Sequence, residues 1–139
     1  MDIDDQINRL TWQVIKCAMR VHSALGPGLL ESAYQACLLQ ELHKCGLNFA
    51  AAIRIPLTYD GVTLECGYII DIIVEDTVIL ELKVVERVLP VHEAQLLTYL
   101  KLTGKPIGLL LNFNVAQMKD GIVRRVNTKQ GGGRKEIQK

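Results

Sequence analysis

Two acidic residues interrupt stretches of the chain that are otherwise apolar. Asp71 lies in the run 68–74 (YIIDIIV), and Glu81 and Lys83 lie in the run 78–85 (VILELKVV). Placing an ionised side chain in an inner strand is costly unless the charge is paired or binds a metal ion. The two runs therefore indicate a polar site that is built on neighbouring strands.

A tight hairpin between the two runs would bring the acidic residues together. With a loop of residues 75–77, Val74 pairs with Val78 and Asp71 lies directly opposite Glu81. Residues paired in this way have Cβ atoms about 4.5–5.5 Å apart on one face of the sheet. A five-residue loop keeps this register, whereas a loop of two or four residues sends the two carboxylates to opposite faces.

Facing carboxylates can bind a metal ion. They repel each other, so one of them takes up a proton unless a cation lies between them. Mg²⁺, or Mn²⁺ in its place, suits hard carboxylate oxygens, lowers the pKa of a bound water and can bridge phosphate oxygens. Lys83 shares the strand face of Glu81. Its ammonium group could orient or deprotonate an attacking water, or stabilise charge on phosphorus.

A purely structural role is the alternative for the same residues. Glu81 and Lys83 could form an ion pair at a sheet edge, and Asp71 could pair with Arg54 or Arg87. Triplets of this kind are common on exposed strands. The register and the place of the strands in the sheet decide between the two interpretations.

Hydrophobic spacing predicts the elements that must position these residues. Apolar residues recur at intervals of three and four before Gly26 and again before Gly46, which is typical of two amphipathic helices. The run 107–113 is too apolar to be half exposed and is expected to be a strand buried on both faces. The predicted order is helices 3–25 and 30–45, strands 52–59, 62–74 and 78–85, a helix from 90 to 104, and strands 107–113 and 122–126. This order predicts an α/β fold with a mixed sheet flanked by helices.

Length and composition limit the organisation of the chain. Its 139 residues, of which 49% are hydrophobic, suffice for one domain, which we expect to span 1–127. The net charge of +1 creates no overall attraction for a polyanion. Basic residues nevertheless gather toward the C-terminus, where 128–139 is expected to be a flexible tail, either a frayed end or a binding arm.

Cysteine spacing and hydropathy indicate the compartment. The four cysteines show no metal-binding spacing and are expected to be small core hydrophobes in a reducing compartment. The N-terminus is acidic and lacks a long apolar core, and no run approaches the roughly 18 apolar residues of a membrane span. These features predict a cytoplasmic protein.

The acidic residues and a following helix form a known combination. Asp71, then Glu81-x-Lys83 after a hairpin, then Gln95-x-x-x-Tyr99 on the next helix resembles the PD-(D/E)xK nuclease superfamily, in particular the branch with a QxxxY helix motif. This resemblance implies a restriction-endonuclease-like αβββαβ core, here with an extra N-terminal helix.

A second motif is more specific. The segment 21–34 contains Gly28, Glu31 and Tyr34 and is similar to the signature of the small bacterial and archaeal GxxExxY proteins. The similarity covers about residues 8–126. Relatives often carry an arginine two residues before the aspartate, where this chain has Ile69, which puts one cationic contact to phosphate in doubt.

The resemblance implies a role for each motif residue. Lys83 would be the catalytic lysine, and Gln95 and Tyr99, which share a helix face, would line the site. The implied metal ligands are Glu31, Asp71 and Glu81.

Three functions remain open at this point. The first is a Mg²⁺- or Mn²⁺-dependent nuclease that cleaves DNA or RNA and acts as a homodimer through the exposed faces of its N-terminal helices. The second is a catalytically silent binding or assembly module of the same fold, favoured by the near-zero net charge and the few aromatic residues. The third is a hydrolase of small phosphodiesters.

Overall fold

A five-stranded sheet lies between helices on both of its faces. The computed structural model describes residues 3–128. The elements in chain order are α1 (Ile3–Leu25), α2 (Glu31–Lys44), β1 (Phe49–Tyr59), β2 (Val62–Val74), β3 (Val78–Lys83), α3 (Pro90–Thr103), β4 (Ile107–Asn112), the 3-10 helix η1 (Met118–Gly121) and β5 (Ile122–Val126). The predicted order of elements is confirmed, with η1 as an addition.

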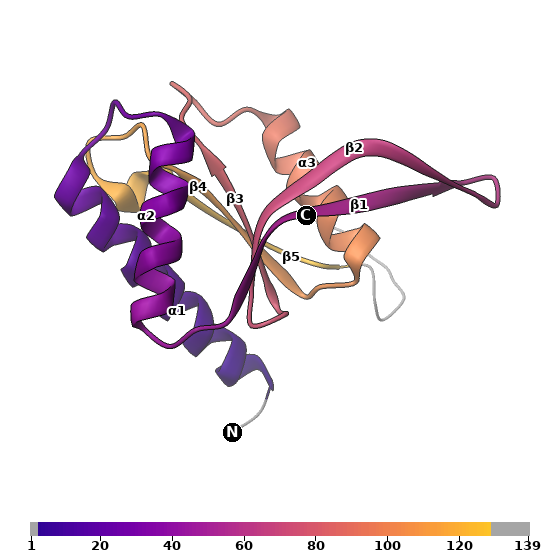
Figure 1. Ribbon diagram of the computed structural model, residues 1–139, viewed down its shortest axis with the longest axis horizontal. Coiled ribbons are helices and arrows are strands. Elements are labelled where there is room, and N and C mark those ends of the chain that lie inside the picture. Colours follow the sequence, from indigo (N-terminus) through magenta and orange to yellow (C-terminus); the bar gives the residue numbers. More distant parts are fainter. Residues whose placement is uncertain (1–2, 129–139) are drawn as a thin grey trace.

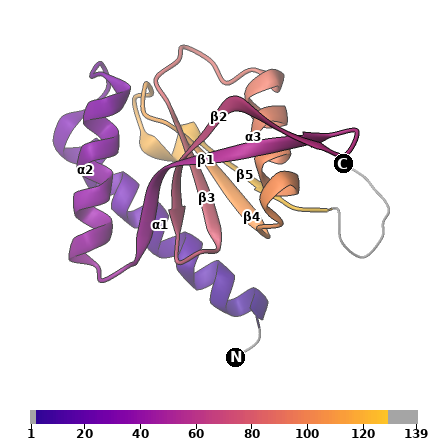
Figure 2. The same cartoon turned by 45° about the vertical axis from the view of Figure 1, so that its right-hand side comes forward.

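The strands lie in the sheet in the order β1-β2-β3-β4-β5. The first two pairs and the last pair are antiparallel, whereas β3 and β4 are parallel because α3 returns the chain between them. Helices α1 and α2 cover one face of the sheet and α3 covers the other (Figure 1, Figure 2). The expected mixed α/β sheet flanked by helices is therefore confirmed.

The two faces of β3 belong to two different apolar cores. Leu80 and Leu82 pack with α1 and α2, whereas Ile79 packs with α3. Alternation along the strand places Glu81 and Lys83 on the α3 face, in line with Ile79. All of β4 is buried, as its apolar sequence predicts.

Strands β1 and β2 form a long hairpin that projects beyond the body of the protein (Figure 1). Asp60 and Gly61 form its turn with φ values of 54° and 77°, the left-handed geometry that suits a two-residue hairpin loop. The register shifts between Ile55 and Leu57. Pro56 lies at this irregularity, where its missing N–H costs no regular ladder bond.

Strand β4 ends at Asn112, one residue before the predicted end, and two other strand boundaries differ by two or three residues. Strand β1 begins at Phe49 rather than at 52, because its first residues are exposed and show no apolar alternation. Strand β3 ends at Lys83 rather than at 85. The buried Asn112 side chain accepts the Val85 N–H at 3.1 Å and donates to the Val85 carbonyl at 2.9 Å, so a side chain replaces the ladder there.

The remaining expectations concern the chain ends and membranes. All but the first residue of the predicted tail, 128–139, lies outside the described residues. Within residues 3–128, no helix combines the length and apolarity that a bilayer crossing requires.

Candidate functional site

Asp71 and Glu81 face each other across β2 and β3. The hairpin pairs Val74 with Val78 and Ile72 with Leu80, as the three-residue loop predicts. One further step in this register places Asp71 opposite Glu81. Glu81 lies on the α3 face of the sheet, near the end of β3.

The two carboxylates accept backbone hydrogen bonds across the hairpin. The Asp71 N–H donates to Glu81 Oε1 at 3.0 Å, and the Leu82 N–H donates to Asp71 Oδ2 at 2.8 Å. The ladder between these strands has its last regular pair at Ile72 and Leu80. Side-chain oxygens therefore take the place of carbonyl groups in holding the strands together here.

Burial and mutual repulsion make these carboxyl groups weak acids. Burial and the charge of Asp71 together raise the pKa of Glu81 to about 8, against the opposing effects of the Asp71 N–H and the charge of Lys83. Burial also raises the pKa of Asp71, while the Leu82 N–H and the charge of Lys83 lower it. Near neutral pH the pair therefore holds a proton that a bound cation would displace.

Lys83 completes this polar end of β3. Its positive charge lowers the pKa values of Asp71 and Glu81, and within residues 3–128 it forms no ion pair. The Lys83 carbonyl accepts the Phe113 N–H at 3.0 Å. The backbone that carries the ammonium group is thus fixed to the end of β4.

Glu31 approaches the pair from the first residue of α2. It is exposed at the helix terminus. Burial raises its pKa, the charge of Asp71 raises it further, and the charge of Lys83 lowers it. Glu31 therefore shares an electrostatic environment with the residues on β2 and β3.

Tyr34 holds the loop that leads into Glu31. Its hydroxyl donates to the Gly26 carbonyl and accepts the Leu29 N–H at 3.2 Å. The ring is fully buried and stacks on Phe113 with 4.5 Å between centroids. Tyr34 thus both packs in the core and fixes the path of the chain into α2.

Gln95 and Tyr99 form the wall of the site on α3. Burial and the charges of Glu81 and Asp71 raise the pKa of Tyr99 to about 12, whereas a hydrogen bond with the Gln95 side chain lowers it. The Tyr99 ring meets Tyr68 edge-on at 6.2 Å. Both residues of the QxxxY motif are therefore brought to the carboxylate pair.

The structure adds Gln35 to these residues. Its Nε2 donates to the Asp71 carbonyl at 3.5 Å. Gln35 lies one helical turn after Glu31, so the i, i+4 spacing could have indicated that both face the same strand. Sequence reasoning did not single it out.

The edge position and the ion pairs that the structural alternative expects are not found within residues 3–128. Strand β3 is the central strand of the sheet and not an edge. Among the ion pairs of the described residues, neither Arg54 nor Arg87 contacts Asp71. The carboxylate pair is therefore not explained by a pairing arginine.

The donor set favours a hard divalent ion. Two carboxylates from adjoining strands, one of them 6% exposed, offer the oxygen ligands that Mg²⁺ and Mn²⁺ prefer. Residues 3–128 contain no group of three or more His, Cys, Asp or Glu side chains already arranged around one metal position. Glu31 as a third ligand thus stays a prediction.

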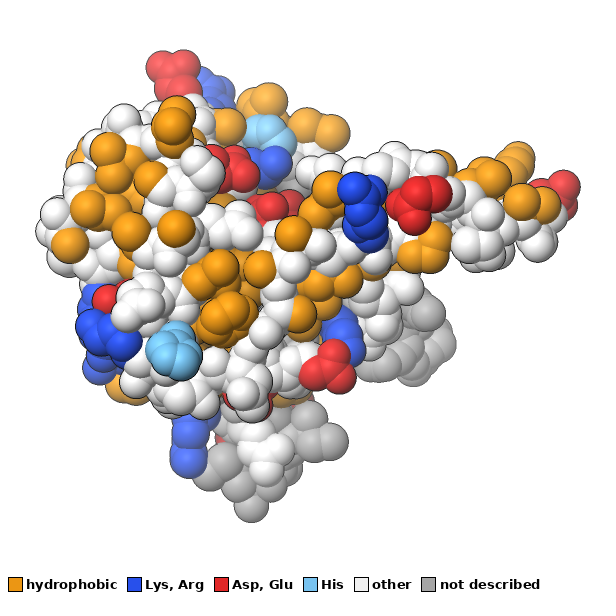
Figure 3. All heavy atoms as spheres, viewed as in Figure 1, with side chains coloured by type: hydrophobic (Ala, Val, Ile, Leu, Met, Phe, Trp, Pro, Cys, Tyr) orange, Lys and Arg blue, Asp and Glu red, His pale blue; other side chains and the backbone are white. Residues whose placement is uncertain are grey.

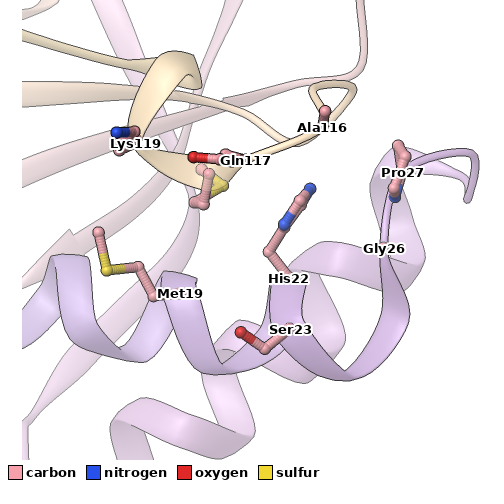
Figure 4. A pocket seen from close by; sticks show the side chains of 9 residues that line it. Met19, His22, Ser23, Gly26, Pro27, Ala116, Gln117 and Lys119 are labelled. Carbon is pink, nitrogen blue, oxygen red and sulfur yellow. The ribbon is translucent and has the colours of Figure 1, made fainter.

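A separate hollow of about 500 Å³ lies between the end of α1 and the segment before β5 (Figure 4). Figure 4 shows Met19, His22 and Ser23 on α1 facing Gln117 and Lys119 on that segment. His22 is 7% exposed and its Nε2 lies 2.8 Å from the Val115 carbonyl. This histidine joins α1 to the loop after β4, and the hollow contains none of the carboxylates of the site.

In the space-filling view, acidic and basic side chains lie together between α2 and α3, at the base of the β1–β2 hairpin (Figure 3).

A family model described as the PD-(D/E)XK nuclease superfamily matches residues 8–126, from the first turns of α1 to the end of β5. A search of curated proteins and a search of solved structures both find no match.

Proposed function

Because the chain belongs to the PD-(D/E)XK nuclease superfamily, we propose that it is a metal-dependent nuclease that hydrolyses phosphodiester bonds of DNA or RNA. The observation that carries this proposal is the facing pair of Asp71 and Glu81, with Lys83 on the same strand face. The Gly28, Glu31 and Tyr34 pattern further supports membership of the GxxExxY family. A cytoplasmic location is part of the proposal, and the sequence supports it because its four cysteines show neither a CxxC nor a CxxH spacing.

Each residue would have a distinct role. Asp71 and Glu81, with Glu31 from α2, would hold Mg²⁺ or Mn²⁺. When bound, such an ion supplies positive charge for the phosphoryl oxygens and lowers the pKa of a coordinated water. The Lys83 ammonium would orient the attacking water or stabilise charge on phosphorus. Gln95 would orient the Tyr99 hydroxyl through their hydrogen bond, and both side chains would line the site on the α3 side.

Cleavage assays with matched variants test this proposal. Single-stranded, duplex and branched DNA and RNA would be incubated with Mg²⁺ or Mn²⁺ and with the wild type, Asp71→Asn or Lys83→Gln. Glu65→Gln and Lys101→Gln change exposed residues away from the site and serve as controls. We expect cutting by the wild type and both controls only. Equal cutting by Asp71→Asn would show that the activity belongs to a contaminant.

A homodimer is part of the proposal. A domain of this size offers little surface for gripping a duplex, and α1 exposes Trp12 and Met19, which are 58% and 38% exposed. Light scattering during size-exclusion chromatography measures the oligomeric state. A dimer that Trp12→Lys converts to a monomer would support α1 as the interface.

A catalytically silent binding module is the second candidate. It is favoured by the net charge of +1 and by the lack of a preformed three-residue metal group within residues 3–128. Divalent-ion titration separates the two candidates. If neither Mg²⁺ nor Mn²⁺ up to millimolar concentration raises the melting temperature, and Glu81→Gln does not change that result, the nuclease proposal loses its basis.

A further inference from the structure

Two cysteine side chains from different helices are in contact on the side of the protein away from the carboxylate pair. Cys17 Sγ in α1 lies 3.6 Å from Cys45 Sγ, at the residue that ends α2. Cys17 is fully buried, whereas Cys45 is exposed. A reagent in solution can therefore reach Cys45, whereas Cys17 is accessible only through its contact with Cys45.

Charged groups around the pair distinguish the two thiols. The Arg20 guanidinium lies 3.5 Å from Cys45 Sγ, and Arg20 also forms an ion pair with Glu41 at 3.8 Å. Arg20 and Cys45 are both exposed, so this contact lies at the surface. Burial raises the pKa of Cys17 to about 12. Cys45 is thus suited to react first and Cys17 to react second.

We propose that Cys17 and Cys45 form a reversible disulfide that links α1 to α2 when the protein meets a low-molecular-weight disulfide such as oxidised glutathione. Cys45 gives its thiol proton to solvent and its sulfur attacks one glutathione sulfur, so that the glutathione S–S bond breaks and one glutathione leaves as a thiolate that takes a proton from water. The Cys17 thiol then gives its proton to solvent and its sulfur attacks the Cys45 sulfur, which releases the second glutathione. Two protein thiols are oxidised and one glutathione disulfide is reduced to two thiols.

The local geometry permits this bond. A disulfide needs its sulfurs about 2.05 Å apart, so the present contact must close by roughly 1.5 Å. Cys45 lies at a helix end and is followed by Gly46, whose φ is 74°. Because Cys45 is exposed, its side chain can turn toward Cys17 while the backbone hydrogen bonds that end α2 stay in place.

The cross-link would stabilise the protein. It closes a loop between positions that are 28 residues apart. Constraining the unfolded chain over such a loop raises the melting temperature of a domain of this size by roughly 10 °C. Nothing in this effect depends on nuclease activity.

The test uses the full reduced chain, oxidised glutathione and peptide mass mapping under non-reducing conditions. We expect a peptide pair joined through Cys17 and Cys45, together with a higher melting temperature that dithiothreitol reverses. Cys45→Ser should abolish both results, and Cys66→Ser, which changes an exposed cysteine on β2, should leave both intact.

Three results would overturn the proposal. The first is a lasting glutathione adduct on Cys45 without a link to Cys17. The second is a disulfide that joins a different pair of cysteines. The third is an equal rise in melting temperature in Cys45→Ser. Because Cys45 is exposed, its serine variant should fold even if substitutions at the buried Cys17 do not.

Discussion

The backbone N–H of Asp71 donates to the Glu81 carboxylate at 3.0 Å, so the main chain of one acidic residue fixes the side chain of the other. The same hairpin carries the reciprocal contact from the Leu82 N–H to the Asp71 carboxylate. The two carboxylates are therefore held in place before any cation binds, although burial still raises their pKa values.

The first prediction concerns stability and pH in metal-free buffer. The folded protein keeps Glu81 protonated up to about pH 8, whereas the unfolded chain releases that proton near the ordinary glutamate pKa of 4.5. Folding then binds extra protons in this window, so the stability of the wild type falls as pH rises from 4.5 to 8. Glu81→Gln removes this loss and should be more stable than the wild type above pH 8 by roughly 2–5 kcal/mol, with little difference at pH 4.5.

Denaturant unfolding at several pH values measures this effect. Glu65→Gln removes an exposed carboxylate from β2 and should follow the wild type throughout. A stability difference between Glu81→Gln and the wild type that does not vary with pH would contradict the assigned burial of the carboxyl group.

The second prediction concerns metal binding and protons. Since the carboxylate pair holds a proton near neutral pH, Mg²⁺ or Mn²⁺ should release up to one proton per ion at about pH 7, and the affinity should rise with pH toward pH 8. Calorimetry in buffers of different ionisation enthalpy counts the released protons. Asp71→Asn should lose the binding, and proton-free binding would place the ion elsewhere.

The third prediction concerns Lys83. Replacement by glutamine keeps much of the length of the side chain but removes the charge that would assist water attack, so the cleavage rate should fall by about 10²–10³-fold. Metal affinity should persist, because Lys83 offers no ligand to a cation in its ammonium form. Rates on a labelled oligonucleotide, with Lys101→Gln as the control, give the comparison. A Lys83→Gln variant with the wild-type rate would remove this residue from the mechanism.

The fourth prediction concerns Tyr34. Phenylalanine keeps the stacking on Phe113 but removes the hydroxyl contacts with Gly26 and Leu29. We expect a loss of about 1–3 kcal/mol in the free energy of unfolding. Hydrogen exchange should speed up in the loop before α2 and stay slow in α3. Unchanged exchange in that loop would show that other contacts hold it.

Much of the fold follows from local sequence patterns. Three features follow from residues that are close in sequence: the helices from their apolar spacing, the hairpin turn from Asp60-Gly61, and β4 from its mostly apolar run. The register of β2 and β3 matches the one that a three-residue loop predicts, although the sequence alone also allowed loop lengths that would have separated Asp71 from Glu81.

Other features depend on contacts between distant segments. Strand β3 ends where the Asn112 side chain, 27 residues away in sequence, takes the backbone hydrogen bonds of Val85. The contact of Gln35 with the Asp71 carbonyl depends on how α2 crosses the sheet. The pairing of Cys17 with Cys45 depends on the packing of α1 against α2. The spacing of residues along the chain does not predict contacts of this kind between distant segments.

The replacement of ladder carbonyls by carboxylates gives the amide protons of Asp71 and Leu82 an unusual property. When a carboxylate changes its protonation or turns toward an ion, the amide that donates to it changes its magnetic environment. The two amides are thus native spectroscopic reporters, and ¹⁵N chemical shifts at these positions would follow occupancy of the pocket without any added probe.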